Sequence, residues 1–71
     1  MPIGQFLREK RIALGFTQDR VAKALLLSHR SQVLKRELGR LEWSFNEVNL
    51  IAKLFGVSMS ELIKEWEQEN G

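Results

Sequence analysis

Glycines divide this 71-residue chain into short segments in which apolar residues recur at helical spacing. Gly15, Gly39 and Gly56 each follow such a segment, at the position where a left-handed glycine commonly ends a helix. No pair of turn residues separates runs of alternating apolar residues, so the sequence predicts no β-strand. The pattern therefore predicts an all-α fold, a compact bundle of five short helices.

Side-chain caps help to place these helices. Thr17 is a candidate N-cap for the second helix, and the stretch from Ser58 to Glu61 matches a capping box before the fifth. The third helix has two candidate caps, Ser28 and Ser31. We expect helices over residues 3–14, over 18–26, from the third cap to about residue 38, over 46–55, and after Ser58 or Ser60.

Length and composition restrict the class of protein. A chain of 71 residues can bury one modest core, so we expect a single domain over residues 1–71. Cysteine is absent, which excludes disulfides and thiolate metal sites. The longest apolar run, residues 24–27, is far shorter than the roughly 20 residues that span a bilayer, and no signal-peptide layout is present. We therefore expect a cytoplasmic protein without membrane contact.

Charge is divided unevenly along the chain. Residues 1–40 carry nine Lys or Arg against three Asp or Glu, a net charge of +6. Residues 41–71 carry two Lys against six Glu, a net charge of −4. A basic half joined to an acidic half favours one face that meets a polyanion, although an uneven distribution of solvated charge is the simpler alternative.

The titratable residues do not support catalysis. The chain has one His, one Asp, no Cys and no Tyr, which leaves no nucleophile–base pair and no metal-binding cluster. We therefore predict a protein that is not an enzyme and that needs neither a metal nor a cofactor.

Two short helices joined by a tight turn, the second of them basic, are typical of a helix-turn-helix, whose second helix enters the DNA major groove. Three motifs accompany this pattern: Gly15-Phe-Thr-Gln18, Glu37-x-Gly39 and Ile51-Ala-Lys-x-x-Gly-Val57. Through them the chain resembles the Cro/CI-type (XRE) family of phage repressors, restriction controller proteins and antitoxins. The resemblance spans residues 3–63 and implies a lambda-repressor-like fold with the helix-turn-helix at about residues 17–38.

The resemblance also implies which residues meet DNA. Base edges are reached from the first turns of the third helix, which here carry Arg30, Ser31, Gln32 and Lys35. Phosphate contacts are expected from Thr17, Gln18, His29 and Arg40, with further candidates in Arg8, Lys10, Arg20, Lys23 and Arg36. Arginine can bind guanine, glutamine can bind adenine, and lysine can bind guanine or phosphate. The alternative is that these side chains form an ordinary solvated helix surface.

A further pair is implied to be structural. The family often pairs an arginine late in the first helix with the glutamate that ends the third, here Arg11 and Glu37. Such a partly buried pair would hold the third helix against the first.

The turn departs from the family pattern. One extra residue lies between Thr17 and Glu37, and leucines stand where the family has a glycine. Because leucine is disfavoured at positive φ, we expect the second helix to continue through Leu26. The extra residue is then accommodated in the turn around Ser28 and His29. Placing it there buries Val33 and exposes Leu34, which contacts either a thymine methyl group or a protein.

The combined interpretation is a transcriptional regulator, a repressor that binds a pseudo-palindromic operator in double-stranded DNA as a homodimer. The alternative is a module whose main partner is another protein, bound through the surface that includes Leu26, Leu27 and Leu34. Three large aromatic residues remain open between core packing and a dimer contact: Trp43, Phe45 and Trp66.

Overall fold

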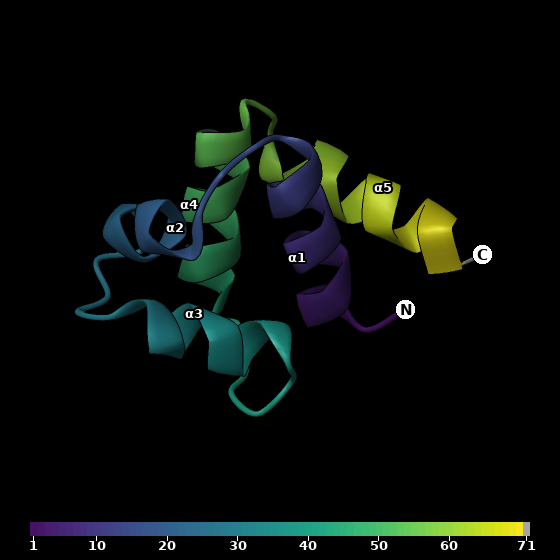
Figure 1. The fold of residues 1–71 in the computed structure, drawn as a ribbon. Coiled ribbons are helices and arrows are strands. Elements are labelled where there is room, and N and C mark those ends of the chain that lie inside the picture. The colour runs from purple at the N-terminus through teal and green to yellow at the C-terminus, as the bar shows by residue number, and fades with distance from the viewer. Residues whose placement is uncertain (71) are drawn as a thin grey trace.

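The computed structural model describes residues 1–70, and within them the chain forms five helices (Figure 1). They are α1 (Ile3–Ala13), α2 (Gln18–Ala24), α3 (Arg30–Glu37), α4 (Phe45–Phe55) and α5 (Met59–Asn70). In Figure 1, α3 lies along the lower edge, and α5 lies on the opposite side of α4 from α2. The predicted all-α, five-helix fold is confirmed.

A single apolar cluster holds the five helices together. Its largest fully buried side chains come from every helix and are Leu7, Val21, Val33, Ile51 and Leu62. Burying one such side chain stabilises the fold by about 1.5–3 kcal/mol. Val33 is completely buried and Leu34 is 40% exposed, as predicted from placing the extra residue in the turn. The cluster thus orients α3 with one face inward and the other in solvent.

The turn between α2 and α3 differs from the prediction. α2 ends at Ala24 instead of continuing through Leu26, and Leu26 takes the left-handed conformation with φ at 60°. The N–H of Leu26 donates to the carbonyl of Lys23, and the N–H of Leu27 donates to that of Ala22. These two bonds form a Schellman motif, the same ending that glycines give α1, α3 and α4. Reversing the chain here lets Leu27 pack against the core, which outweighs the strain at Leu26.

Replacing Leu26 with glycine is expected to stabilise the fold. The leucine side chain is 88% exposed and contributes little packing, whereas its left-handed backbone costs about 1–2 kcal/mol. Glycine removes that strain but adds backbone entropy to the unfolded state, so the net gain is about 1 kcal/mol. Thermal unfolding should show a midpoint about 5 °C higher. The exposed Leu14 also follows a helix but has φ at −86°, so Leu14→Gly should lower the midpoint.

Close backbone packing joins α1 to α3. A Cβ atom added at Gly4 would collide with the carbonyl oxygen of Arg36 and lie 2.9 Å from that of Glu37. Because the collision involves backbone atoms, no side-chain movement could relieve it. The missing side chain of Gly4 therefore sets how closely α1 approaches the end of α3.

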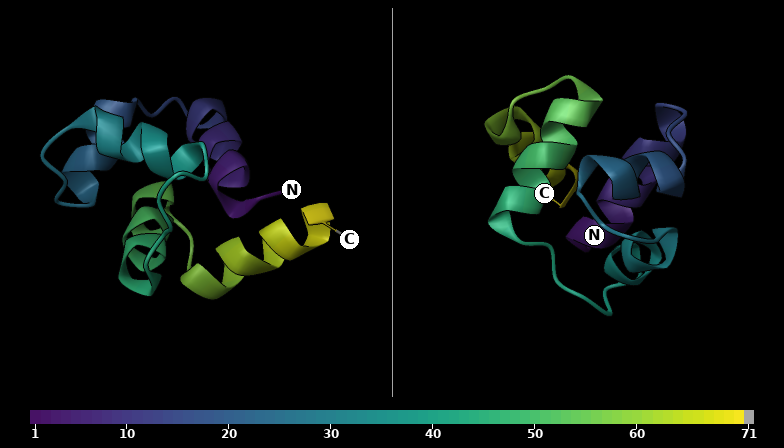
Figure 2. Two further views of the ribbon diagram at one scale, coloured as in Figure 1. Left: turned by 90° about the horizontal axis from the view of Figure 1, so that it is seen from below. Right: turned by 90° about the vertical axis from the view of Figure 1, so that its left-hand side faces the viewer.

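The three aromatic residues left open by the sequence separate into two groups. Trp43 and Trp66 are half-buried and pack against the core. The indole N–H of Trp66 donates to the carbonyl oxygen of Met1 at 2.8 Å, which ties α5 to the N-terminus (Figure 2). Phe45 is 76% exposed at the start of α4. Core packing therefore accounts for the two tryptophans and not for Phe45.

Candidate nucleic-acid interface

The solvent-facing side of α3 lies on the surface of the bundle, where Figure 2 shows the helix from below. α3 packs against α2 and α1 through its inward residues, Val33 and Glu37. Its exposed residues are Arg30, Leu34 and Lys35, with Ser31 half-buried beside them. Two cations and one hydroxyl thus stand on a face that nothing else in the described chain covers.

The cap of α3 is His29, and the prediction of Ser28 or Ser31 was wrong. His29 has extended backbone angles, and its Nδ1 accepts from the N–H of Ser31 at 3.1 Å. In return, Oε1 of Gln32 accepts from the N–H groups of Ser28 and His29. The left-handed turn at Leu26 moves the start of α3 so that the residue after Ser28 occupies the cap position. The carbonyl end of Gln32, a predicted base reader, is consequently used inside the helix start.

Of the other three predicted base readers, Arg30 and Lys35 are exposed and Ser31 is half-buried. A guanidinium nitrogen of Arg30 lies 3.7 Å from Asp19, and both side chains are more than half exposed, so this pair adds little stability. The hydroxyl of Ser31 lies 2.9 Å from Nδ1 of His29. Lys35 is exposed one turn after Ser31. The arginine and lysine can therefore reach a ligand without breaking buried contacts.

The four predicted phosphate ligands lie near the two ends of α3. Thr17 caps α2 by accepting from the N–H of Arg20 at 3.0 Å. Nε2 of Gln18 donates to Oε1 of Glu37 at 3.1 Å, which orients the amide beside α3. His29 and Arg40 are exposed at the two ends of α3. These residues, which lie before, at the start of and after α3, could therefore contact successive phosphates of one DNA strand.

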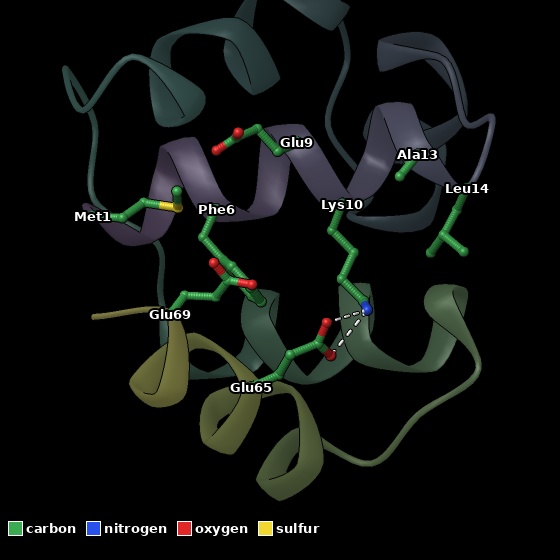
Figure 3. Close-up of a pocket in the computed structure, with 8 residues that line it drawn as sticks. All are labelled: Met1, Phe6, Glu9, Lys10, Ala13, Leu14, Glu65 and Glu69. Carbon is green, nitrogen blue, oxygen red and sulfur yellow. Dashed lines mark hydrogen bonds and ion pairs between the residues drawn. The ribbon is translucent and has the colours of Figure 1, made fainter. Parts of the chain in front are cut away.

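Two of the further phosphate candidates are bound elsewhere. Nζ of Lys10 lies 2.6 Å from Oε1 of Glu65 on α5, within a pocket between α1 and α5 (Figure 3). A guanidinium nitrogen of Arg36 lies 3.0 Å from Glu47, and another donates to the backbone carbonyl oxygen of Gln32. We therefore remove Lys10 and Arg36 from the candidate interface.

A buried ion pair fixes the position of α3. Nε of Arg11 donates to Oε2 of Glu37 at 2.7 Å, and Nη2 donates to Oε1 at 3.3 Å. Nη1 of the same arginine donates to the carbonyl oxygen of Phe16 at 2.9 Å. The Glu37 side chain is only 1% exposed and also accepts from Gln18. One carboxylate thus links α1, the start of α2 and the end of α3.

A second ion pair, which the sequence did not reveal, links α3 to α4. Arg36 binds Glu47, and Glu47 also accepts from the N–H of Ser44 in the capping box of α4. Burial is the largest single influence on the pKa of Glu47, and it raises this pKa. The hydrogen bonds from Ser44 and Arg36 and the charge of Arg36 lower the pKa, and together they outweigh the effect of burial. The net result is a pKa below the ordinary 4.5. The S-x-x-E pattern at residues 44–47 is the signal that could have indicated this cap.

The lowered pKa of Glu47 predicts a stability that depends on pH. A carboxyl whose pKa is lower in the folded state stabilises the fold fully above its unfolded pKa, here 4.5, and loses this contribution as the pH falls through its folded pKa. Glu47→Gln should therefore unfold more easily than the unchanged chain by about 1–2 kcal/mol at neutral pH. Urea titrations over a pH series should show this gap closing below pH 4.5. For the exposed Glu67, the Glu67→Gln gap should stay near zero.

No helix within residues 1–70 is long and apolar enough to cross a membrane. The described residues hold no group of three His, Cys, Asp or Glu that could bind a metal ion.

Comparison with known protein families gives a match that covers most of the chain. Residues 7–62 match the family model described as helix-turn-helix. None of the curated proteins and none of the solved structures matches the chain significantly.

Proposed function

The chain belongs to the Cro/CI-type helix-turn-helix family, whose domain implies DNA binding, and on that premise we propose a sequence-specific transcriptional repressor that acts as a homodimer. The observation that carries the proposal is the outer face of α3, where the exposed Arg30 and Lys35 lie beside a half-buried Ser31. Members of this family are typically not enzymes. A cytoplasmic location stays a prediction.

The residues would divide the work as follows. Arg30, Ser31 and Lys35 lie where base edges would pass, whereas the side-chain oxygen of Gln32 serves the cap of α3. Phosphates would be bound by the residues at the edges of the face: Thr17, Gln18, His29 and Arg40. Nδ1 of His29 accepts from Ser31, so Nε2 carries the proton in the neutral ring and can donate to a phosphate.

A dimer would present two copies of α3 to successive major grooves about 34 Å apart, on a pseudo-palindromic operator. Each copy is proposed to be one domain over residues 1–71, of which Gly71 lies outside the described residues. Binding there would exclude polymerase from an overlapping promoter.

Fluorescence anisotropy tests the proposal. A preferred duplex is first selected from a random library, and its affinity is compared with that of a scrambled duplex over a salt series. If six phosphates are neutralised, affinity should fall about a thousandfold between roughly 50 and 200 mM salt. Light scattering of the complex should give two chains per duplex. Equal affinity for both duplexes at every salt concentration would refute sequence-specific binding.

A protein partner remains the second candidate because Leu26 is 88% exposed in the turn. Leu27, which the sequence placed on the same surface, is half-buried and packs against the core. The surface available to such a partner is therefore smaller than expected. Equal affinity for the selected and the scrambled duplex in the anisotropy assay would favour this second candidate.

A further inference from the structure

The structure changes which side chains of α3 are free to read DNA. The side-chain oxygen Oε1 of Gln32 accepts hydrogen bonds in the cap, and the guanidinium group of Arg36 is paired with Glu47. Val33 and Glu37 are buried. The outer face therefore consists of Arg30, Ser31, Leu34 and Lys35, and Leu34 is the apolar member of this set.

The surroundings of Leu34 favour DNA over an apolar protein surface. Leu34 lies one turn after Arg30 and directly beside Lys35 in the sequence. It also lines a groove of about 510 Å³ between α1 and α3, which holds the apolar Pro2 and Leu38 and, on α1, the polar Gln5 and Arg8. An apolar partner helix in this groove would remove the charge of Arg8 from water, which costs free energy. A phosphodiester strand would instead pair with it.

The chemistry of the major groove identifies the contact. Base-pair edges there present hydrogen-bond donors and acceptors together with one apolar group, the C5-methyl of thymine. A leucine among polar readers buries apolar surface against this methyl and has no comparable partner at a guanine or cytosine edge.

We propose that Leu34 is a specificity-determining residue that contacts a thymine methyl group, next to the base pair that Lys35 reads. Gln32 is a positioning residue that holds the start of α3. This inference rests on the proposed function, because it assumes that the outer face of α3 enters the major groove.

Deoxyuridine substitution tests the contact, because it removes the thymine methyl and nothing else. Each thymine of the selected duplex is replaced singly, and dissociation constants are measured by anisotropy. For the unchanged protein, one position per half-site should lose about fourfold in affinity, the effect of one buried methyl group. Leu34→Ala should lose a similar factor on the thymine duplex and show no further loss with deoxyuridine.

A matched variant separates reading from positioning. Gln32→Glu keeps a side-chain acceptor for the cap, so it should retain the fold and weaken every duplex by a similar factor without changing base preference. Circular dichroism checks that both variants are folded. A Leu34→Ala protein with the same thymine-to-deoxyuridine ratio as the unchanged chain would overturn the role of Leu34. A Gln32→Glu protein with relaxed adenine preference would overturn the positioning role.

The two proposals fail differently. If no duplex is preferred over its scrambled form, the proposed function itself is wrong. If a duplex is preferred but no thymine methyl contributes to binding, only the assignment of Leu34 is wrong.

Discussion

Gly4→Ala is expected to destabilise the protein even though alanine is the better helix former. The added Cβ would collide with the carbonyl oxygen of Arg36 and lie 2.9 Å from that of Glu37. Overpacking of this kind costs about 3 kcal/mol when backbone cannot yield, and the helix propensity of alanine returns about 1 kcal/mol. The net loss of about 2 kcal/mol should lower the thermal midpoint by about 10 °C.

Urea and thermal unfolding, followed by circular dichroism, measure this effect. Gln5→Ala is the matched control, since Gln5 is the exposed neighbour of Gly4 on α1 and should change stability by less than about 0.5 kcal/mol. A Gly4→Ala protein as stable as the control would mean that α1 does not approach α3 as closely as described.

Glu37→Leu should have the larger effect. It removes both bonds from Arg11 and the bond from Gln18, and leaves the guanidinium buried without its carboxylate. Breaking one side of a buried ion pair costs about 3–5 kcal/mol, which is most of the stability of a domain this small. DNA affinity should fall as well, because the end of α3 loses its attachment to α1.

The double variant Arg11→Met, Glu37→Leu distinguishes a lost charge partner from lost packing. It removes both charges, so denaturant titration should recover much of the stability lost by Glu37→Leu. The less buried pair of Lys10 and Glu65, whose side chains are 21% and 42% exposed, provides the control, and Glu65→Leu should cost about 1 kcal/mol. If Glu37→Leu costs no more than Glu65→Leu, the buried pair does not hold α3.

Local patterns in the sequence predicted the parts of the fold that depend on local physics. Helix ends at Gly15, Gly39 and Gly56 follow from the freedom of glycine at positive φ, and all three take it. The burial of Val33 followed from requiring an apolar residue at the inward position of α3. The pairing of Arg11 with Glu37 was implied by family resemblance, because no spacing rule places residues 11 and 37 together.

The features that the sequence did not reveal depend on tertiary contacts. Gly4 reads as an ordinary glycine in a helix until the carbonyls of α3 are placed beside it. Leu26 adopts a strained conformation because the turn brings Leu27 against the core. Local backbone propensity does not include the free energy of this tertiary packing. The cap at His29 follows from that turn. Arg36 was a candidate phosphate ligand because the sequence does not show that Glu47, on α4, lies beside it.

The central claim, that the outer face of α3 meets DNA, is tested most directly by two double variants with equal loss of charge. Anisotropy with the selected duplex compares Arg30→Ala, Lys35→Ala with Lys53→Ala, Lys64→Ala, which removes two exposed lysines from α4 and α5. We expect the α3 variant to lose about a hundredfold in affinity, together with its preference over a scrambled duplex, and the control to lose less than about threefold. Equal losses in the two variants would contradict the assignment of α3 as the DNA-binding surface.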